Sequence, residues 1–245
     1  MDRSHIEYLQ FHWGPISGCL HGPDTCPVVD DCWARAMANR FRSRYAPGFR
    51  PTMHWTRLLE PLDRKKPARI GVSFMGDFCG PQVHYHWQRA VLETVRRCPQ
   101  HTFIFLTKAG EQLPQFQWPE NCLVGVTITG ALPDVDTRNL TALKKVQATV
   151  RWLSFEPLLA PWEGDLSGIQ WVVIGGLSGH HAKCPNLEWV GAIMEEAGRR
   201  GIPIWMKNNL AQGRALPWAA EDLIQELPDI IEALKSGRKL GKEGP

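Results

Sequence analysis

The chain has 245 residues, of which 43% are hydrophobic and 22% charged, the balance of an ordinary globular protein. It holds no run of eighteen apolar residues, and the opening MDRSHIEYLQFHW lacks the apolar core of a secretion signal, so we expect neither a membrane span nor export. The net charge of +3 excludes a uniformly basic or acidic protein, and we expect a cytoplasmic location.

Short, almost continuously apolar runs recur along the chain, as is typical of strands buried on both faces of a parallel sheet. One lies within YLQFHWG, before Cys19. The others are residues 68–75, 101–107, 121–129, 149–156, 169–176 and 202–207.

Helical patterns lie between several of these runs, over residues 83–97, 136–146, 186–200 and 219–236. Strands that alternate with helices predict right-handed βαβ units. We therefore expect an α/β fold, a partial TIM-type (β/α)6-7 barrel with parallel strands, formed by one domain over residues 1–235. An open doubly wound sheet is the alternative. The Gly- and Lys-rich residues 236–245 are expected to form a flexible tail.

Three of the seven cysteines, Cys19, Cys26 and Cys32, fall within fourteen residues before a helical pattern. Three thiolates on such a loop can hold three irons of a [4Fe–4S] cluster and leave the fourth iron open. Zinc with His21 or His12 as fourth ligand is a rival, although the C-x6-C-x5-C spacing lacks the tight pairs usual for zinc. Three unrelated buried thiols are the third interpretation.

Polar residues follow nearly every predicted strand, and the carboxyl ends of parallel strands meet at one edge where sites form. The residues that we select as candidates at this edge are Ser73, Asp77, Lys108, Thr127, Ser154, Glu156, Gly175, Gly176, Ser178 and Lys207. Taken singly, each has a plainer explanation: Gly175 and Gly176 as a tight turn, Glu156 as the partner of Arg151 or a lysine, and each lysine as a surface charge.

Positive charge is concentrated in residues 40–69, which hold nine Lys or Arg and two Asp or Glu. The segment also carries Tyr45, Phe49 and Trp55. Basic and aromatic residues together favour contact with a polyanion such as nucleic acid. A solvated loop is the alternative.

The stretch from WGPISGC to CWARAMANRF resembles the N-terminal cysteine motif of the radical S-adenosylmethionine (SAM) superfamily. It resembles more closely a phage-associated branch of radical-SAM-like proteins whose function is largely unassigned. Further matches follow in family order over nearly the whole chain: RLLEPLDRKKPARIGVSFMGD, PQHTFIFLTK, LVGVTIT, VRWLSFEPLL, WVVIGGLSG and GIPIWMKN.

The chain departs from the pattern of this branch at several positions. Five residues instead of two separate the last two cysteines, and Trp33 replaces a tyrosine. Gly14 replaces an asparagine, and Leu177 stands where the branch has a glutamate. The last change removes one expected contact to the SAM amino group.

The resemblance implies a [4Fe–4S] cluster on Cys19, Cys26 and Cys32, with SAM bound to the open iron. One electron would cleave SAM to methionine and a 5′-deoxyadenosyl radical, which abstracts hydrogen from the substrate. Gly175, Gly176 and Ser178 would hold the methionine end of SAM. The ribose, adenine or substrate would contact Ser73, Asp77, Thr127, Ser154 and Glu156. An electron donor such as flavodoxin is implied.

The phage branch and the basic segment together favour a DNA base or nucleotide as substrate. A base must leave the duplex to reach a barrel rim. One concrete hypothesis is a radical isomerase or lyase acting on an amino-acid-modified, glycyl-type thymidine in phage DNA hypermodification, in the cytoplasm of the host cell. Lys108, Lys207 and Glu156 are the candidate catalytic residues. The alternatives are a DNA-repair lyase of the same chemistry and a zinc-stabilised nucleic-acid-binding protein without catalysis.

Overall fold

The structure is a computed structural model that describes residues 1–245 except 180, 212–218, 230 and 232–245. In the described residues the strands are β1 (Asp2–Arg3), β2 (Phe11–Trp13), β3 (Ile16–Ser17), β4 (Thr52–Met53), β5 (Arg69–Val72), β6 (Thr102–Thr107), β7 (Cys122–Thr127), β8 (Val150–Phe155), β9 (Trp171–Ile174) and β10 (Ile204–Met206). The α-helices are α1 (Trp33–Arg40), α2 (Tyr85–Arg96), α3 (Pro133–Lys144) and α4 (Leu187–Arg199).

The main sheet of the described chain has the order β1-β2-β5-β6-β7-β8-β9-β10. From β2 to β10 every neighbouring pair is parallel, and only β1 runs antiparallel, against β2. Each apolar run read as a strand in the sequence contains one of these parallel strands, and the expected α/β fold is confirmed.

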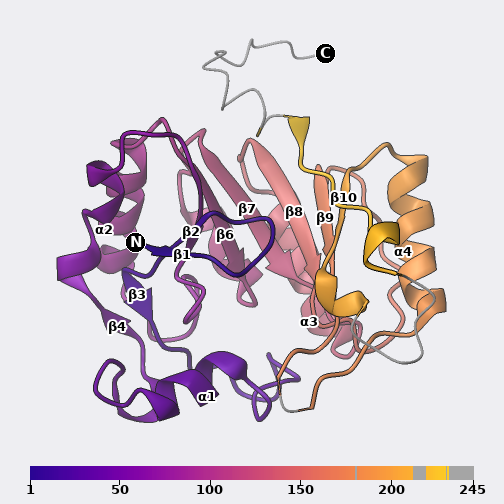
Figure 1. Ribbon diagram of the computed structural model, residues 1–245, viewed down its shortest axis with the longest axis horizontal. Helices are drawn as coiled ribbons and strands as arrows, with labels where there is room; N and C mark the ends of the chain where they lie inside the picture. Colours follow the sequence, from indigo (N-terminus) through magenta and orange to yellow (C-terminus); the bar gives the residue numbers. More distant parts are fainter. Residues whose placement is uncertain (180, 212–218, 230, 232–245) are drawn as a thin grey trace.

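The strand order decides between the two architectures considered from the sequence. It follows the chain without a reversal, whereas a doubly wound sheet reverses its order at a switch point. Right-handed crossovers that always advance in one direction place their helices on one face, and α2, α3 and α4 surround the sheet on its outer side (Figure 1). The result is consistent with a partial barrel.

Aromatic side chains fill the inner face of the sheet. Trp152 and Trp171 lie with ring centroids 5.1 Å apart, and Tyr8 meets Trp171 edge-on at 5.2 Å. Glycine makes the room, because a Cβ on Gly125 would lie 2.4 Å from Cε2 of Trp152. Alternate residues of the same strands face outward and pack against the helices.

Residues 4–10 lie between the two edges of the sheet, across its inner face (Figure 1). The Tyr8 ring packs edge-on against Trp205 of β10, with ring centroids 6.1 Å apart. The Glu7 carboxylate accepts a hydrogen bond from the Asn208 N–H at 3.0 Å. On the other side, the Arg69 guanidinium donates to the Tyr8 carbonyl. Residues 4–10 therefore connect β5 with β10, which lie far apart in the order of the described sheet and share no strand hydrogen bonds.

Three of the four helices expected between and after the strands are confirmed as α2, α3 and α4. The fourth, over residues 219–236, is wrong in its first half: a short 3-10 turn covers Ala220–Asp222, and the chain then extends. Met206 N–H donates to the Ile224 carbonyl and Glu226 N–H to the Ile204 carbonyl. Pairing along the exposed edge of β10 thus outweighs helix propensity there.

The remainder of that expected helix and the expected tail, residues 236–245, lie largely or wholly outside the described residues. Within the part of the chain that the structure covers, no helix is long and apolar enough to cross a membrane.

Candidate functional site

The carboxyl ends of the parallel strands bring most of the predicted site residues onto one face. Gly125, Trp152 and Trp205 point to the inner face, and side chains alternate along a strand. Residues an even number of positions further along each strand share that face. At the strand ends these are Thr127, Ser154, Glu156 and Lys207. The expected convergence of these side chains is present in the structure.

Two serines at this end are buried and have hydroxyls without a hydrogen-bond partner. Ser154 is completely buried and Ser73 is 1% exposed, and neither Oγ has a partner in the structure. Ser73 also adopts a φ of 58°, a left-handed conformation that is unfavourable for a residue other than glycine. Unpaired buried hydroxyls and backbone strain together are features that concentrate at ligand sites.

Glu156 and Lys207 form an ion pair, with Nζ 2.5 Å from Oε1. This agrees with the plainer sequence interpretation of Glu156 as the partner of a lysine, although not of Arg151. Lys207 is only 9% exposed, and the Glu156 carboxylate supplies the partner that a buried ammonium group needs. A Cβ on Gly175 would lie 3.2 Å from both side chains, so a larger residue there would crowd the ion pair.

Asn209 organises the Gly-Gly turn, and the sequence analysis missed it. Its Oδ1 accepts from the Gly176 N–H at 3.2 Å, and its Nδ2 donates to the Gly176 carbonyl and to Ser178 Oγ. The only sequence signal was its position, two residues after Lys207 at the end of the last strand. Asn209 thus holds Gly176 and Ser178 in one fixed turn next to the Glu156–Lys207 pair.

The cysteine loop is joined to the sheet at Gly18. Its N–H donates to the Met75 carbonyl, and Gly18 forms an isolated parallel bridge with Gly76. Gly18 has a φ of 90°, and a Cβ there would lie 2.2 Å from the Arg50 carbonyl oxygen. Only glycine permits this approach, which fixes Cys19 beside the loop that follows β5.

Asp77 connects the cysteine loop to two strand ends. Its carboxylate accepts from Thr107 Oγ1 at 2.6 Å, from the Cys79 N–H at 3.0 Å and from the Lys108 N–H at 2.9 Å. The fourth contact joins Oδ2 to Nε2 of His21, between Cys19 and Cys26, at 2.8 Å.

Burial alone would raise the pKa of Asp77, but the hydrogen bond and charge of His21, with the bonds from Thr107 and Lys108, lower it below its usual value. Asp77 therefore stays charged, and its contacts favour a role in positioning the cysteine loop. A direct contact between Asp77 and a cofactor stays a prediction.

The three loop thiols lie in one region without meeting at one point. Cys19 and Cys32 pack against the same small cluster as Phe49, and Cys26 is buried. Burial raises the pKa of the Cys19 thiol to about 12, and the charges of Asp77, Cys26 and Cys32 act in the same direction. A thiol in this setting becomes a thiolate when a metal binds it.

Among the described residues, no group of three or more His, Cys, Asp and Glu side chains is placed to hold a single metal ion. The histidines considered as a fourth zinc ligand are engaged elsewhere. His21 has Asp77 on Nε2 and Thr25 on Nδ1, and His12 Nε2 lies 3.0 Å from Ser4 Oγ.

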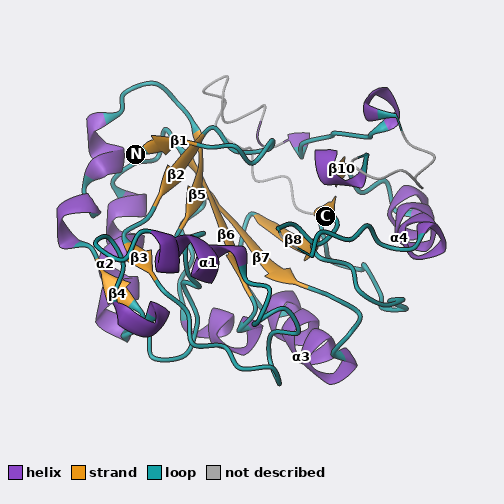
Figure 2. Cartoon of the chain, turned by 60° about the horizontal axis from the view of Figure 1, so that its bottom comes forward, coloured by secondary structure: helices purple, strands orange, loops and turns teal. Residues whose placement is uncertain are grey.

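The loop after β9 reaches the cysteine loop. His181 Nδ1 lies 2.5 Å from Oδ1 of Asp31, the residue before Cys32. The turn organised by Asn209 and the cysteine loop are therefore neighbours at the same end of the sheet, where Figure 2 shows α1 in front of the strand ends.

The family comparison adds a classification. The family model described as "Protein of unknown function (DUF5131)" matches residues 3–223. The chain belongs to the DUF5131 family. No curated protein and no solved structure matches it.

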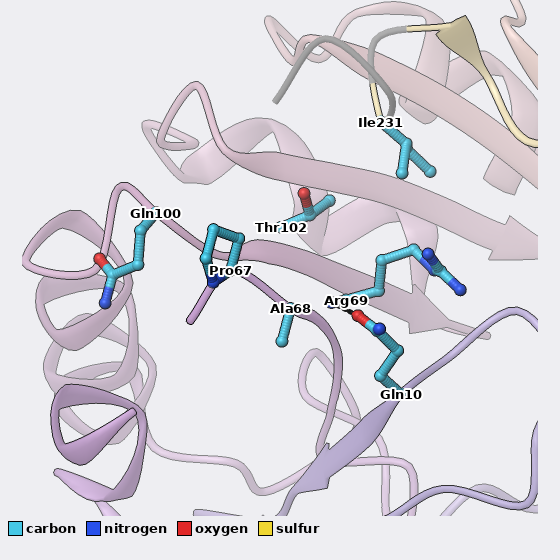
Figure 3. Close-up of a pocket in the computed structure, with 7 residues that line it drawn as sticks. All are labelled: Gln10, Pro67, Ala68, Arg69, Gln100, Thr102 and Ile231. Atoms are coloured by element: carbon cyan, nitrogen blue, oxygen red, sulfur yellow. Dashed lines mark hydrogen bonds between the residues drawn. The ribbon is translucent and has the colours of Figure 1, made fainter. Parts of the chain in front are cut away.

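The amino ends of the strands in this DUF5131 protein carry a small cavity in place of the polar residues found at the carboxyl ends. A cavity of about 100 Å³ lies there, at the first residues of β5 and β6 (Figure 3). Gln10 crosses it to accept a hydrogen bond from the Arg69 N–H at 2.9 Å. None of the predicted site residues lines this cavity.

Proposed function

We propose that this protein is a radical SAM enzyme that abstracts a hydrogen atom from a nucleic-acid base or nucleotide. The observation that carries the proposal is the placement of three loop thiols at the end of the sheet where two buried serine hydroxyls lack partners. Neither feature is needed for a packed barrel, and together they provide metal ligands and unused hydrogen-bonding groups in one region.

The thiols suit a cluster better than a single ion. Their C-x6-C-x5-C spacing lacks the close pairs usual for a zinc site, and Cys19 and Cys32 pack against the same small cluster. A cluster gives each thiolate its own iron, so the ligands can stand apart. His12 Nε2 already lies 3.0 Å from Ser4 Oγ, whereas the His21 ring, held by Asp77 on Nε2, keeps the arrangement of a metal-ligating histidine, so iron and zinc content after purification separates the two interpretations.

When bound, a [4Fe–4S] cluster and SAM would supply the electron and the 5′-deoxyadenosyl radical for hydrogen abstraction. The protein's own contribution is positioning. Asp77 and His21 hold the loop that carries Cys19 and Cys26, and Asn209 holds the turn of Gly176 and Ser178. Ser73 and Ser154 offer hydroxyls for the ribose or adenine of SAM.

We assign the substrate to the Glu156–Lys207 pair and to Lys108, which all follow strands at the carboxyl end of the sheet. Lys108 Nζ is 3.5 Å from Thr127 Oγ1 at the end of the neighbouring strand. A paired lysine and carboxylate can exchange their mutual contact for a zwitterion, such as the amino-acid group of a glycyl-type thymidine. An isomerase or lyase acting on such a base, with an electron donor such as flavodoxin, is the form of the activity that we propose.

The test is 5′-deoxyadenosine formation from SAM by protein purified without oxygen, reconstituted with iron and sulfide, and given a strong reductant. We expect a brown protein that forms 5′-deoxyadenosine, and a Cys19→Ala, Cys26→Ala, Cys32→Ala variant that binds no iron and forms none. The matched control removes three other thiols, by Cys98→Ala, Cys122→Ala and Cys184→Ala, and should retain iron.

Two results would contradict the proposal. A colourless protein that binds zinc and leaves SAM intact would favour the non-catalytic binding protein. Formation of 5′-deoxyadenosine that responds to a small metabolite but not to DNA would retain the chemistry and remove the nucleic-acid substrate. A panel of damaged and hypermodified DNA separates repair from the hypermodification reaction.

A further inference from the structure

We infer that one face of α1, together with the arginines that follow it, is the surface that binds a single nucleic-acid strand. The inference rests on the proposed function only in taking nucleic acid as the substrate class. It names the side chains that hold the strand and where they lie relative to the cysteines.

An apolar stripe on α1 is exposed. Trp33, Met37 and Phe41 are 46%, 39% and 39% exposed. The spacing of four residues places Trp33 and Met37 on one side of the helix, and Phe41 is the residue that ends it. The buried side of α1 is formed by Ala34 and Ala38, which pack against Phe49. The large residues of this helix thus face solvent and the small ones face the core, the reverse of an ordinary surface helix.

Arginine guanidinium groups lie beside this stripe. Arg40 falls two turns after Trp33 on the same side, and its Cζ lies 5.6 Å from the centroid of the Phe41 ring. Arg44 lies 5.9 Å from the same ring. A flat ring flanked by two guanidinium groups offers stacking for a base and charge for its phosphates.

The structure divides the basic segment of residues 40–69 into two parts. In the second part the arginines serve the fold: Arg57 pairs with Asp2 and Glu60, and Arg64 lies 4.1 Å over the Phe11 ring.

In the first part, Arg40, Arg42, Arg44 and Arg50 are exposed and form no ion pair within the described chain. The sequence has no acidic residue between Asp31 and Glu60. This unbalanced positive charge is complementary to a polyanion.

The position of the stripe matches the proposed site. Trp33 follows Cys32 directly in the chain, and α1 lies at the end of the sheet that holds the cysteine loop (Figure 1). Exposed rings can stack only on bases that are not already stacked in a duplex. A single strand or a flipped-out nucleotide therefore fits this surface better than an intact duplex.

The experiment is fluorescence anisotropy of a labelled oligothymidylate strand with the reconstituted full chain, without SAM, over a series of salt concentrations. A hairpin duplex of equal length is the comparison. We expect tighter binding of the single strand. Trp33→Ala and Phe41→Ala should each weaken it by roughly 5- to 150-fold, the range for loss of one stacked base, whereas Trp33→Tyr, which keeps a ring, should bind nearly as the parent does.

Arg40→Gln with Arg44→Gln should weaken binding and reduce the slope of log K against log salt by about 1.4, for two lost phosphate contacts on a single strand. The matched control is Lys65→Gln with Lys66→Gln, which removes two exposed charges of the same basic segment beside Met1 and Phe11. This control should leave both affinity and slope unchanged. Far-ultraviolet circular dichroism confirms that each variant is folded.

Equal losses from the lysine and arginine pairs would overturn the inference, as would an unchanged affinity in both ring variants. Preference of the same surface for an acidic electron-transfer protein such as flavodoxin, lost in the same variants, would also overturn it in favour of a protein partner. Strand binding needs no SAM cleavage. A chain that binds the strand but forms no 5′-deoxyadenosine would therefore contradict the proposed function alone.

Discussion

The two ends of the sheet's inner face are made from the same strands but from opposite kinds of residue. Towards the amino ends, Trp152, Trp171 and Tyr8 interlock with their neighbours, and the Trp152 indole N–H donates to the Phe105 carbonyl at 3.2 Å. At the carboxyl ends, Ser73 and Ser154 are buried with unused hydroxyls. The contrast is one of packing against polarity, since the aromatic region also holds one buried polar atom without a partner in the described chain, Trp205 Nε1. The polar end is the region that we propose to bind a ligand.

The largest effect that this contrast predicts is at Trp152. Trp152→Ala should lower the free energy of unfolding by about 3–5 kcal/mol, because a fully buried indole leaves a cavity that the barrel cannot close. Chemical denaturation measures it. Trp55→Ala is the matched control, since Trp55 is 56% exposed and should change stability by no more than about 0.5 kcal/mol. Equal effects at both positions would remove the distinction between the regions.

The next effect is at Asp77, which belongs to the polar end but is fully satisfied. Asp77→Ala should lower stability by about 1–3 kcal/mol, because buried donors lose their acceptor, and should also lower the iron content after reconstitution. Asp136→Ala is the control, since Asp136 accepts from the N–H groups of Thr129 and Gly130 away from the cysteine loop. It should cost similar stability and leave iron content unchanged. An equal loss of iron in both variants would mean that Asp77 acts only through general stability.

A substitution at Ser73 should raise stability instead of lowering it. Ser73→Gly should raise stability by about 1 kcal/mol, because glycine adopts the left-handed φ of 58° without the penalty of a Cβ. The same change removes one of the unused hydroxyls and should weaken SAM binding, measured by equilibrium dialysis. Greater stability with unchanged SAM affinity would show that the Ser73 hydroxyl does not contact SAM and that the backbone strain has no role in binding.

The smallest expected effect on stability is at Ser154. Ser154→Ala removes a buried hydroxyl that has no hydrogen-bond partner among the described residues, so the free energy of unfolding should change by no more than about 0.5 kcal/mol, while SAM binding weakens. A marked loss of stability would show that the hydroxyl already has a structural role. The four variants together would show whether stability and ligand binding are divided between the two ends.

Much of this architecture could be predicted from the sequence. Strands buried on both faces are continuous apolar runs, so all seven parallel strands were visible, and their polar residues at the carboxyl ends indicated the edge of the site. The helix expected over residues 219–236 failed because Gln225 and its neighbours pair with β10. That pairing depends on an edge strand distant in sequence, which local periodicity does not report.

The contacts that organise the site were hidden for the same reason. His21 meets Asp77, and Asn209 meets Gly176, across long separations in sequence. A histidine between two cysteines suggests a metal ligand from the sequence alone, and a carboxylate on its other ring nitrogen is compatible with that role. Only the assembled strand ends bring the His21 ring and the Asp77 carboxylate together.

The segment of residues 4–10 has a consequence for how the chain is made. Tyr8 is synthesised long before its partner Trp205. The contact between them can form only after β10 has been synthesised, so the inner face of the sheet stays incompletely covered until then. Such late closure between distant residues is slow and leaves apolar surface open to aggregation. The nascent chain is thus expected to depend on chaperones until β10 emerges.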